Sequence, residues 1–135
     1  MRARILIVED NSRMREIESA GLREHGYEVF DAGGLNEAAI LLRSQGFALV
    51  VTDIRLPGGL SGIDLAREVK RLWRGTKVLL VGADLEGFAV DDFRDACDAT
   101  LAKPFTLEQL RARVAFLIVE QDALTCTQNN SRFVD

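Results

Sequence analysis

The stretch FALVVTDIRLPGGLSG, residues 47–62, decides how the rest of the chain is interpreted. Its first half is a continuous apolar run rich in β-branched residues, which is typical of a strand buried on both faces of a parallel sheet. Asp53 stands where this strand should end, and the Leu56-Pro57-Gly58-Gly59 sequence after it can neither extend a strand nor begin a helix cleanly. Because ligands bind outside the carboxyl ends of strands in open α/β sheets, Asp53 is a candidate functional carboxylate. This stretch alone is equally consistent with an Asp53 that only caps the following turn.

Composition indicates a single acidic globular domain. The chain has 135 residues, of which 47% are hydrophobic, enough for a core without disulfides. Its net charge of −4 and isoelectric point near 5.1 argue against direct binding to nucleic acid. No apolar run reaches membrane-spanning length and no signal peptide precedes the first strand, so we expect a cytoplasmic protein without membrane contact. Cys97 and Cys126 are too few for a disulfide framework or a zinc site.

Strand-like and helix-like segments alternate along the chain. Short strands are expected at residues 5–8, 27–32, 47–51, 77–81 and 100–101. The helices are expected to bury apolar residues at helical spacing: Met14, Ile17 and Leu22; Ala38, Leu41 and Leu42; Leu65, Ala66, Val69, Leu72 and Trp73; and Leu107, Leu110, Val114, Leu117 and Ile118. The segment over residues 85–99 is strongly acidic and the least clearly helical.

Several helix ends carry sequence signals. Asn11 or Ser12 can cap the first helix and Gly26 can end it, and Asn36 is expected to cap the second helix. Thr106 with Gln109 three residues later forms a capping-box pattern that opens the last helix.

This alternation predicts a parallel sheet with helices on both faces and right-handed crossovers. Two α/β architectures fit: a flavodoxin-like (βα)5 doubly wound sheet with strand order 2-1-3-4-5, and a Rossmann-type half. No G-x-G-x-x-G follows the first strand and no G-x-x-x-x-G-K-[ST] occurs in the chain, which disfavours dinucleotide and P-loop nucleotide binding.

In the flavodoxin-like order the first and third strands are neighbours, which brings Glu9, Asp10 and Asp53 together. Two carboxylates ~4 Å apart repel by about 1 kcal/mol in water and about 4 kcal/mol near a protein surface, so the cluster needs a cation. Mg²⁺, which binds one or two carboxylates and keeps several waters, suits it best. Lys103 follows the last strand and brings a positive charge to the same edge. Such a set of groups indicates a carboxylate nucleophile, Asp53, that receives a phosphoryl group.

Over roughly residues 4–121 the chain resembles the receiver domain of two-component response regulators. The resemblance rests on ILIVED at residues 5–10, VVTDIRLPGGLSG at residues 50–62 and KPF at residues 103–105, in that order within the βα pattern. It implies a phosphoprotein of a phosphorelay, whose phosphoryl group comes from a sensor histidine kinase or a histidine phosphotransfer protein.

The resemblance also implies a role for each matching residue. Asp53 would be the phosphoacceptor, and Asp10, Asp53 and the backbone carbonyl of Arg55 would bind Mg²⁺ directly, with Glu9 acting through water. Lys103 would pair with the acceptor and then with the phosphoryl oxygens. The peptide bond that precedes Pro104 would be cis.

Some positions depart from the family pattern. Gly82 stands where receivers place a Thr or Ser that binds the phosphoryl group, and Thr100 stands where an aromatic residue usually swings inward. A hydrogen bond to a charged group contributes about 1.5–3 kcal/mol, comparable with the ~1–3 kcal/mol of typical coupling between sites. We therefore expect a receiver that switches weakly or by another route, for example through the backbone N–H of Ala83. Arg55 and Asp84 lie at positions that, in the receiver family, influence the phosphoryl lifetime. In this chain they would form either an ion pair over the acceptor or two solvated charges.

The output side is described only coarsely by the sequence. The acidic segment over residues 85–99 either faces a basic partner or is solvated. Phe116 and Val119 lie off the core face of the last helix, which suggests self-association or cover by the tail. Because receivers often pair through this side, the resemblance also suggests a homodimer through the 85–121 side.

Residues 1–121 are expected to form the receiver domain and residues 122–135 a polar tail, in a stand-alone receiver or in a piece of a longer regulator. The leading interpretation is a phosphoacceptor signalling module that is not an enzyme. A pseudo-receiver, whose output is independent of phosphorylation, stays open because of Gly82 and Thr100. A phosphatase of the haloacid-dehalogenase type fits poorly, because Arg55 stands where those enzymes place an acid/base Asp.

Overall fold

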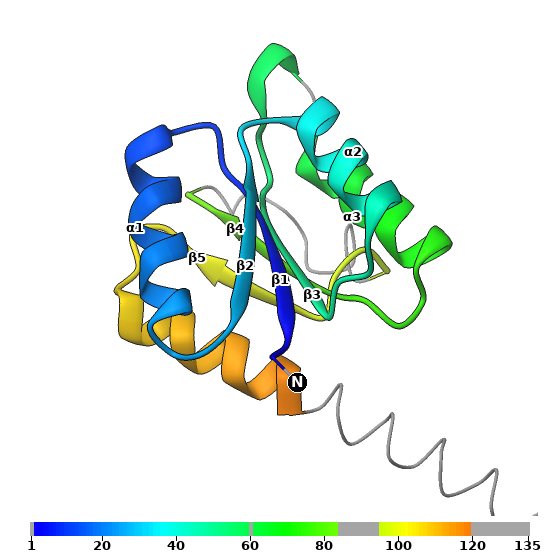
Figure 1. Cartoon of the computed structure of the whole chain (residues 1–135). Helices are drawn as coiled ribbons and strands as arrows, with labels where there is room; N and C mark the ends of the chain where they lie inside the picture. The colour runs from blue at the N-terminus through cyan, green and yellow to red at the C-terminus, as the bar shows by residue number, and fades with distance from the viewer. Residues whose placement is uncertain (1, 60, 84–94, 120–135) are drawn as a thin grey trace, which may run out of the picture.

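The computed structural model of the chain describes residues 2–59, 61–83 and 95–119. Five parallel strands form one sheet in the order β2-β1-β3-β4-β5 (Figure 1). They are β1 (Arg4–Val8), β2 (Glu28–Ala32), β3 (Leu49–Asp53), β4 (Lys77–Gly82) and β5 (Ala99–Ala102). The flavodoxin-like order expected from the sequence is confirmed, and the polar strand β2 lies at an edge, as its composition indicates.

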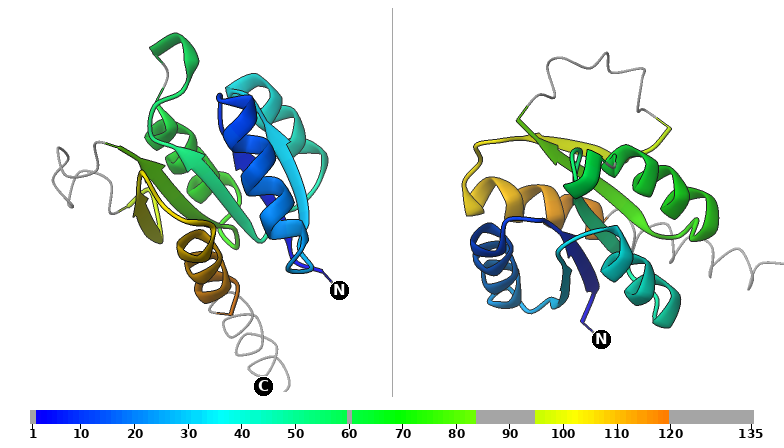
Figure 2. Two further views of the ribbon diagram at one scale, coloured as in Figure 1. Left: turned by 90° about the vertical axis from the view of Figure 1, so that its left-hand side faces the viewer. Right: turned by 90° about the horizontal axis from the view of Figure 1, so that it is seen from above.

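Helices cover both faces of the sheet (Figures 1 and 2). α1 (Ser12–Arg23) and a helix over residues 107–119 pack on one face, and α2 (Leu35–Ser44) and α3 (Gly62–Leu72) pack on the other. Alternate residues of each strand therefore enter different cores: Leu6, Val50 and Leu80 face α2 and α3, whereas Ile5, Val51 and Leu79 face α1 and the helix over 107–119. Central strands buried on both faces explain the continuous apolar runs in the sequence.

Most of the predicted helix caps are present. The Asn11 side chain accepts a hydrogen bond from the Met14 N–H at 3.0 Å, and Gly26 has a φ of 89° just after α1. Thr106 and Gln109 form a reciprocal capping box, with N···O distances of 2.8 and 3.1 Å.

The prediction that Asn36 caps α2 is wrong. The helix begins at Leu35 and its N-cap is Gly34, which makes no side-chain hydrogen bond. The Glu37 carboxylate instead reaches back and accepts a hydrogen bond from the Gly33 N–H at 3.0 Å. An acid in the first turn therefore replaces the expected cap.

Two helix faces also differ from the prediction. Ile17, expected in the core, is 47% exposed, while Glu18 beside it is only 4% exposed. α1 turns its Glu18–Leu22 side inward, where Gly21 lies so close to the next helix that a Cβ would sit 2.9 Å from Leu107 Cδ2. Successive residues are about 100° apart on a helix, so Ile17 lies about 100° from Glu18 and about 140° from Leu22 and falls off this buried side. Leu72 is 50% exposed because it is the last residue of α3, and Trp73 packs against the core in its place.

Parts of the output side lie outside the described residues. The acidic segment predicted over 85–99 is described only from residue 95, and the tail predicted over 122–135 is not among the described residues. None of the described helices is long and apolar enough to cross a membrane.

Candidate functional site

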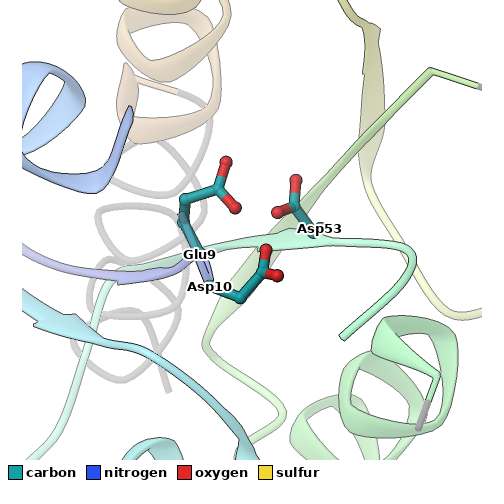
Figure 3. A group of neighbouring side chains, drawn as sticks. All are labelled: Glu9, Asp10 and Asp53. Carbon is teal, nitrogen blue, oxygen red and sulfur yellow. The ribbon is translucent and has the colours of Figure 1, made fainter. Parts of the chain in front are cut away.

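The carboxyl ends of β1, β3 and β5 bring the predicted charged residues to one edge of the sheet. Val8 pairs with Thr52 in the register of β1 and β3, so the residues that follow, Glu9 and Asp53, lie beside each other. Glu9, Asp10 and Asp53 each offer a carboxylate oxygen within 4.8 Å of the others, and Figure 3 shows the three carboxylates turned toward one another. Strand pairing thus produces the acidic cluster that the sequence predicted.

Lys103 lies between two of these acids. Its Nζ is 2.7 Å from Glu9 Oε1 and 2.8 Å from Asp53 Oδ1. The peptide bond between Lys103 and Pro104 is cis, as the resemblance implied. The single charge of Lys103 therefore balances at most one of the three carboxylates of this cluster.

Burial makes this charge imbalance costly. Glu9 and Asp53 are 2% and 7% exposed, whereas Asp10 is open to solvent. Burial, followed by the hydrogen bond with Glu9, raises the pKa of Asp53 to about 8, and Lys103 only partly opposes it. Burial also acts to raise the pKa of Glu9, but hydrogen bonds with Asp53 and Lys103 outweigh it and lower that pKa to about 2. Burial and the contact with Glu9 thus favour the protonated form of Asp53 when no cation is bound.

The residues fit a hard divalent cation. The three acids supply oxygen ligands, the donor type that Mg²⁺ prefers. A cavity of about 200 Å³ opens beside them and is lined in part by Asp10, Asp53, Arg55 and Lys103. A water occupies about 30 Å³ in the liquid, so this space admits a partly hydrated ion together with a small group near Asp53.

The backbone around Asp53 is held tightly by the start of α3. The Gly62 N–H donates to the Ile54 carbonyl at 2.5 Å, and the Ile54 N–H donates to the Val81 carbonyl at 2.9 Å. A Cβ at Gly62 would lie only 1.6 Å from the Asp53 carbonyl oxygen, so only glycine allows this approach. The intervening turn (Pro57–Gly59) contains Gly58 with a φ of 80°, a conformation that favours glycine. These glycines explain why the motif after Asp53 is rich in them.

The positions that depart from the receiver pattern occupy different places. Gly82 and Ala83 line the same cavity as Asp53, and a Cβ at Gly82 would lie 3.2 Å from Ile54 Cδ1. Thr100 pairs with Leu80 in the sheet and is half-buried. Asp84 lies outside the described residues, so its pairing with Arg55 stays a prediction.

Two residues of α1 near the cluster were missed at the sequence level. Arg15 donates from Nη1 to the Glu9 carbonyl oxygen at 2.8 Å. Glu18 is buried in the same helix, and its burial, together with the charge of Glu9, raises the pKa of Glu18 to about 7. The only sequence signal was position: both residues lie within three turns of the Glu9-Asp10 pair on a helix that begins there.

The comparisons with known proteins agree with this geometry. The family model described as the response regulator receiver domain matches residues 5–115. A probable transcriptional regulatory protein of Picosynechococcus is 34% identical over 138 residues, which cover 96% of this chain and 55% of that protein. The transcriptional activator protein PfeR of Pseudomonas aeruginosa is 35% identical over 128 residues, which cover 93% of this chain and 41% of that protein. The chain therefore spans about half the length of the curated relatives that it matches.

Two solved structures match along almost all of their length. A CheY-like receiver domain protein from Methanospirillum hungatei aligns with a TM-score of 0.83 and 28% identity, covering 91% of this chain and 98% of that chain. The response regulator protein TrrA from Thermotoga maritima, solved in complex with Mg²⁺-BeF, aligns with a TM-score of 0.76 and 32% identity, covering 85% of this chain and 98% of that chain.

Proposed function

Because the chain belongs to the response regulator receiver domain family, we propose that Asp53 accepts a phosphoryl group from a histidine kinase or a histidine phosphotransfer protein in a Mg²⁺-dependent reaction. One observation carries this proposal: Asp53 is a nearly buried carboxylate at the end of a central strand, with Lys103 Nζ 2.8 Å away and two further acids beside it. Receiver domains are signalling domains and generally not enzymes, and we assign this chain to that class.

The proposed reaction is a substitution at phosphorus. An oxygen of Asp53 attacks the phosphorus of a phosphohistidine, and the O–P bond forms as the N–P bond breaks. The donor imidazole leaves with the electron pair and takes up a proton. Lys103 forms an ion pair with the Asp53 carboxylate before transfer and would pair with the phosphoryl oxygens after it. Asp10, Asp53 and the carbonyl of Arg55 would hold Mg²⁺ directly and Glu9 through water, and the cation supplies charge neutralisation for the transferring group.

The signal would then leave through protein contacts, with a weak or unusual switch. Gly82 offers no hydroxyl to a phosphoryl group, so the backbone N–H of Ala83 is the proposed donor on this side of the cavity. Thr100 has no aromatic ring, so it cannot act as the aromatic side chain that usually swings inward at this position in receivers. The same two residues favour the second candidate, a pseudo-receiver whose output does not depend on phosphorylation, whereas the intact acids and Lys103 favour phosphorylation.

The proposed partners follow from the exposed surface and from the relatives. Phe116 and Val119 are 67% and 66% exposed, three residues apart on the helix over 107–119. We propose that this surface contributes to a homodimer through the 85–121 side. The curated relatives are named as transcriptional regulators, so we propose that residues 1–121 act in the cytoplasm as the receiver domain of such a system, without contacting DNA or a membrane.

The chemical nature of the phosphorylated residue tests the proposal. The protein is treated with acetyl phosphate and Mg²⁺, and the bound phosphate is then exposed to neutral hydroxylamine. Hydroxylamine should cleave an acyl phosphate on Asp53 and release the phosphate label that the protein took from the donor. Asp53→Asn should carry no label. Asp64→Asn, which removes an exposed acid of α3, should behave like the wild type. Label that resists hydroxylamine, or that persists in Asp53→Asn, would contradict the assignment.

A further inference from the structure

Arg15 of α1 contacts the backbone of the segment that carries two of the three acids. Its Nη1 donates to the Glu9 carbonyl oxygen at 2.8 Å, and its Nε lies 3.9 Å from Asp31 Oδ1 on the edge strand β2. Ser19, one turn further along α1, donates from Oγ to Asp31 Oδ2 at 3.4 Å. A continuous set of polar contacts therefore runs from β2 through α1 to the end of β1.

This contact is closely enclosed. The Arg15 side chain is 24% exposed, and it passes over Gly33, where a Cβ would lie 3.1 Å from Nη1. The Glu9 N–H donates to the Ala32 carbonyl at 3.0 Å, so the backbone of Glu9 is held on its N–H side by β2 and on its carbonyl side by Arg15.

The Glu9 carbonyl belongs to the peptide group that joins Glu9 to Asp10. Because a peptide group is planar, fixing its oxygen also fixes the plane that contains both Cα atoms. The directions in which the two carboxylate side chains leave the backbone are set by that plane. We infer that Arg15 is a positioning residue that orients Glu9 and Asp10 toward a divalent cation, and that Asp31 holds Arg15 in place. This inference rests on the Mg²⁺ site proposed above.

Positioning and charge predict opposite results when Arg15 is removed. Arg15 is a cation near an acidic cluster, so its charge alone opposes a second cation, and removing it would tighten Mg²⁺ binding. Loss of positioning would weaken Mg²⁺ binding instead. Mutating a group that orients metal ligands typically lowers metal affinity by about 10–100-fold. We expect an Mg²⁺ affinity about tenfold lower without Arg15, because the hydrogen bond between the Glu9 N–H and the Ala32 carbonyl remains.

The test is a calorimetric titration with Mg²⁺ alone, at one pH and ionic strength, with thermal unfolding measured in metal-free buffer for every variant. Arg15→Ala should bind Mg²⁺ about tenfold more weakly than the wild type. Arg15→Lys should lie between them, because an ammonium can reach the Glu9 carbonyl but lacks the guanidinium fork that also faces Asp31. Asp31→Asn should weaken binding to a smaller extent. Arg13→Ala removes the same charge from the exposed side of α1 and should bind at least as tightly as the wild type.

The negative outcomes distinguish a failure of the positioning role of Arg15 from a failure of the proposed Mg²⁺ site. If the wild type binds Mg²⁺ and Arg15→Ala binds it equally well or more tightly, the positioning role is overturned, even where thermal stability falls. Should Arg15→Ala fail to fold, a wild-type Mg²⁺ affinity in both Arg15→Lys and Asp31→Asn would overturn it. A wild-type protein that binds no Mg²⁺ would overturn the proposed metal site itself, and the inference with it.

Discussion

Mg²⁺ binding to the acidic cluster should release a proton. Without a cation, Asp53 and Glu9 share a hydrogen bond, and the pKa of Asp53 is raised to about 8 by its burial and by Glu9. A cation requires the ionised carboxylates as ligands, so the proton of the pair must leave when the cation binds. Since this pKa lies above its usual value, the proton is present at neutral pH and competes with Mg²⁺ until the pH exceeds about 8.

The size of the effect follows from that pKa. For one competing proton the apparent dissociation constant rises by the factor 1 + 10^(8−pH), which is about 100 at pH 6, about 10 at pH 7 and about 2 at pH 8. Each pH unit below 8 thus costs about 1.4 kcal/mol of binding free energy. At pH 7 nearly one proton should be released for each Mg²⁺ bound.

Calorimetry in buffers of different ionisation enthalpy measures the released protons directly. At pH 7 the observed binding enthalpy, plotted against the ionisation enthalpy of the buffer, should have a slope corresponding to nearly one proton released. The dissociation constant for Mg²⁺ should fall steadily from pH 6 to pH 8. Asp53→Asn removes the titrating acid, so its weaker residual binding should lose most of this pH dependence. Identical heats in all buffers, with a constant affinity from pH 6 to pH 9, would show that Asp53 and Glu9 are both ionised before Mg²⁺ binds and that no proton is released.

Three further changes have defined outcomes. Glu18→Gln should gain stability relative to the wild type as the pH rises. Burial raises the pKa of Glu18 from 4.5 to about 7, so the unfolded chain ionises at lower pH than the folded protein. The free energy of unfolding of the wild type should therefore fall by about 3 kcal/mol between pH 4.5 and 7. Urea unfolding without Mg²⁺ at pH 5 and pH 8 checks this, and a pH-independent difference would contradict it. Gly62→Ala should lower the free energy of unfolding by at least about 3 kcal/mol, because its Cβ would overlap the Asp53 carbonyl oxygen. Gly34→Ala is the control, since a Cβ there meets nothing within 4 Å, and equal stabilities of the two variants would contradict the clash. Gly82→Thr should fold, since the closest atoms to its Cβ would be those of the Ile54 side chain, at 3.2–3.5 Å, without backbone among them. It should enlarge the phosphorylation-dependent NMR shifts over residues 82–101. Full-size shifts already present in the wild type would contradict the weak switch.

The sheet and the acidic cluster could be predicted because both depend on short-range patterns. A central parallel strand is buried on both faces, so β1 and β3 appear as continuous apolar runs whatever their partners are. The carboxyl ends of parallel strands meet at one edge, which places Glu9, Asp10 and Asp53 together once the strand order is assumed.

The orientation of α1 could not be predicted in this way. Its apolar residues are too few to define one face, and the packed helix buries the side of Glu18 and Leu22 and leaves Ile17 exposed. The Arg15 contact was missed for a related reason: a flexible cation on a helix has many partners within reach, and only the final packing selects the Glu9 carbonyl. The cap of α2 was missed because the helix begins before Asn36, at Leu35, with Gly34 as its N-cap.

Phosphorylation of Asp53 is tested most directly by the intact mass of the protein after incubation with Mg²⁺ and a small-molecule phosphodonor, measured beside Asp53→Asn. A single phosphoryl adduct is expected on the wild type, and it should be absent from Asp53→Asn and absent when Mg²⁺ is removed. Measurable Mg²⁺ binding without an adduct, both with this donor and with a phosphohistidine protein, would contradict phosphorylation of Asp53 and would favour a receiver that signals without phosphorylation.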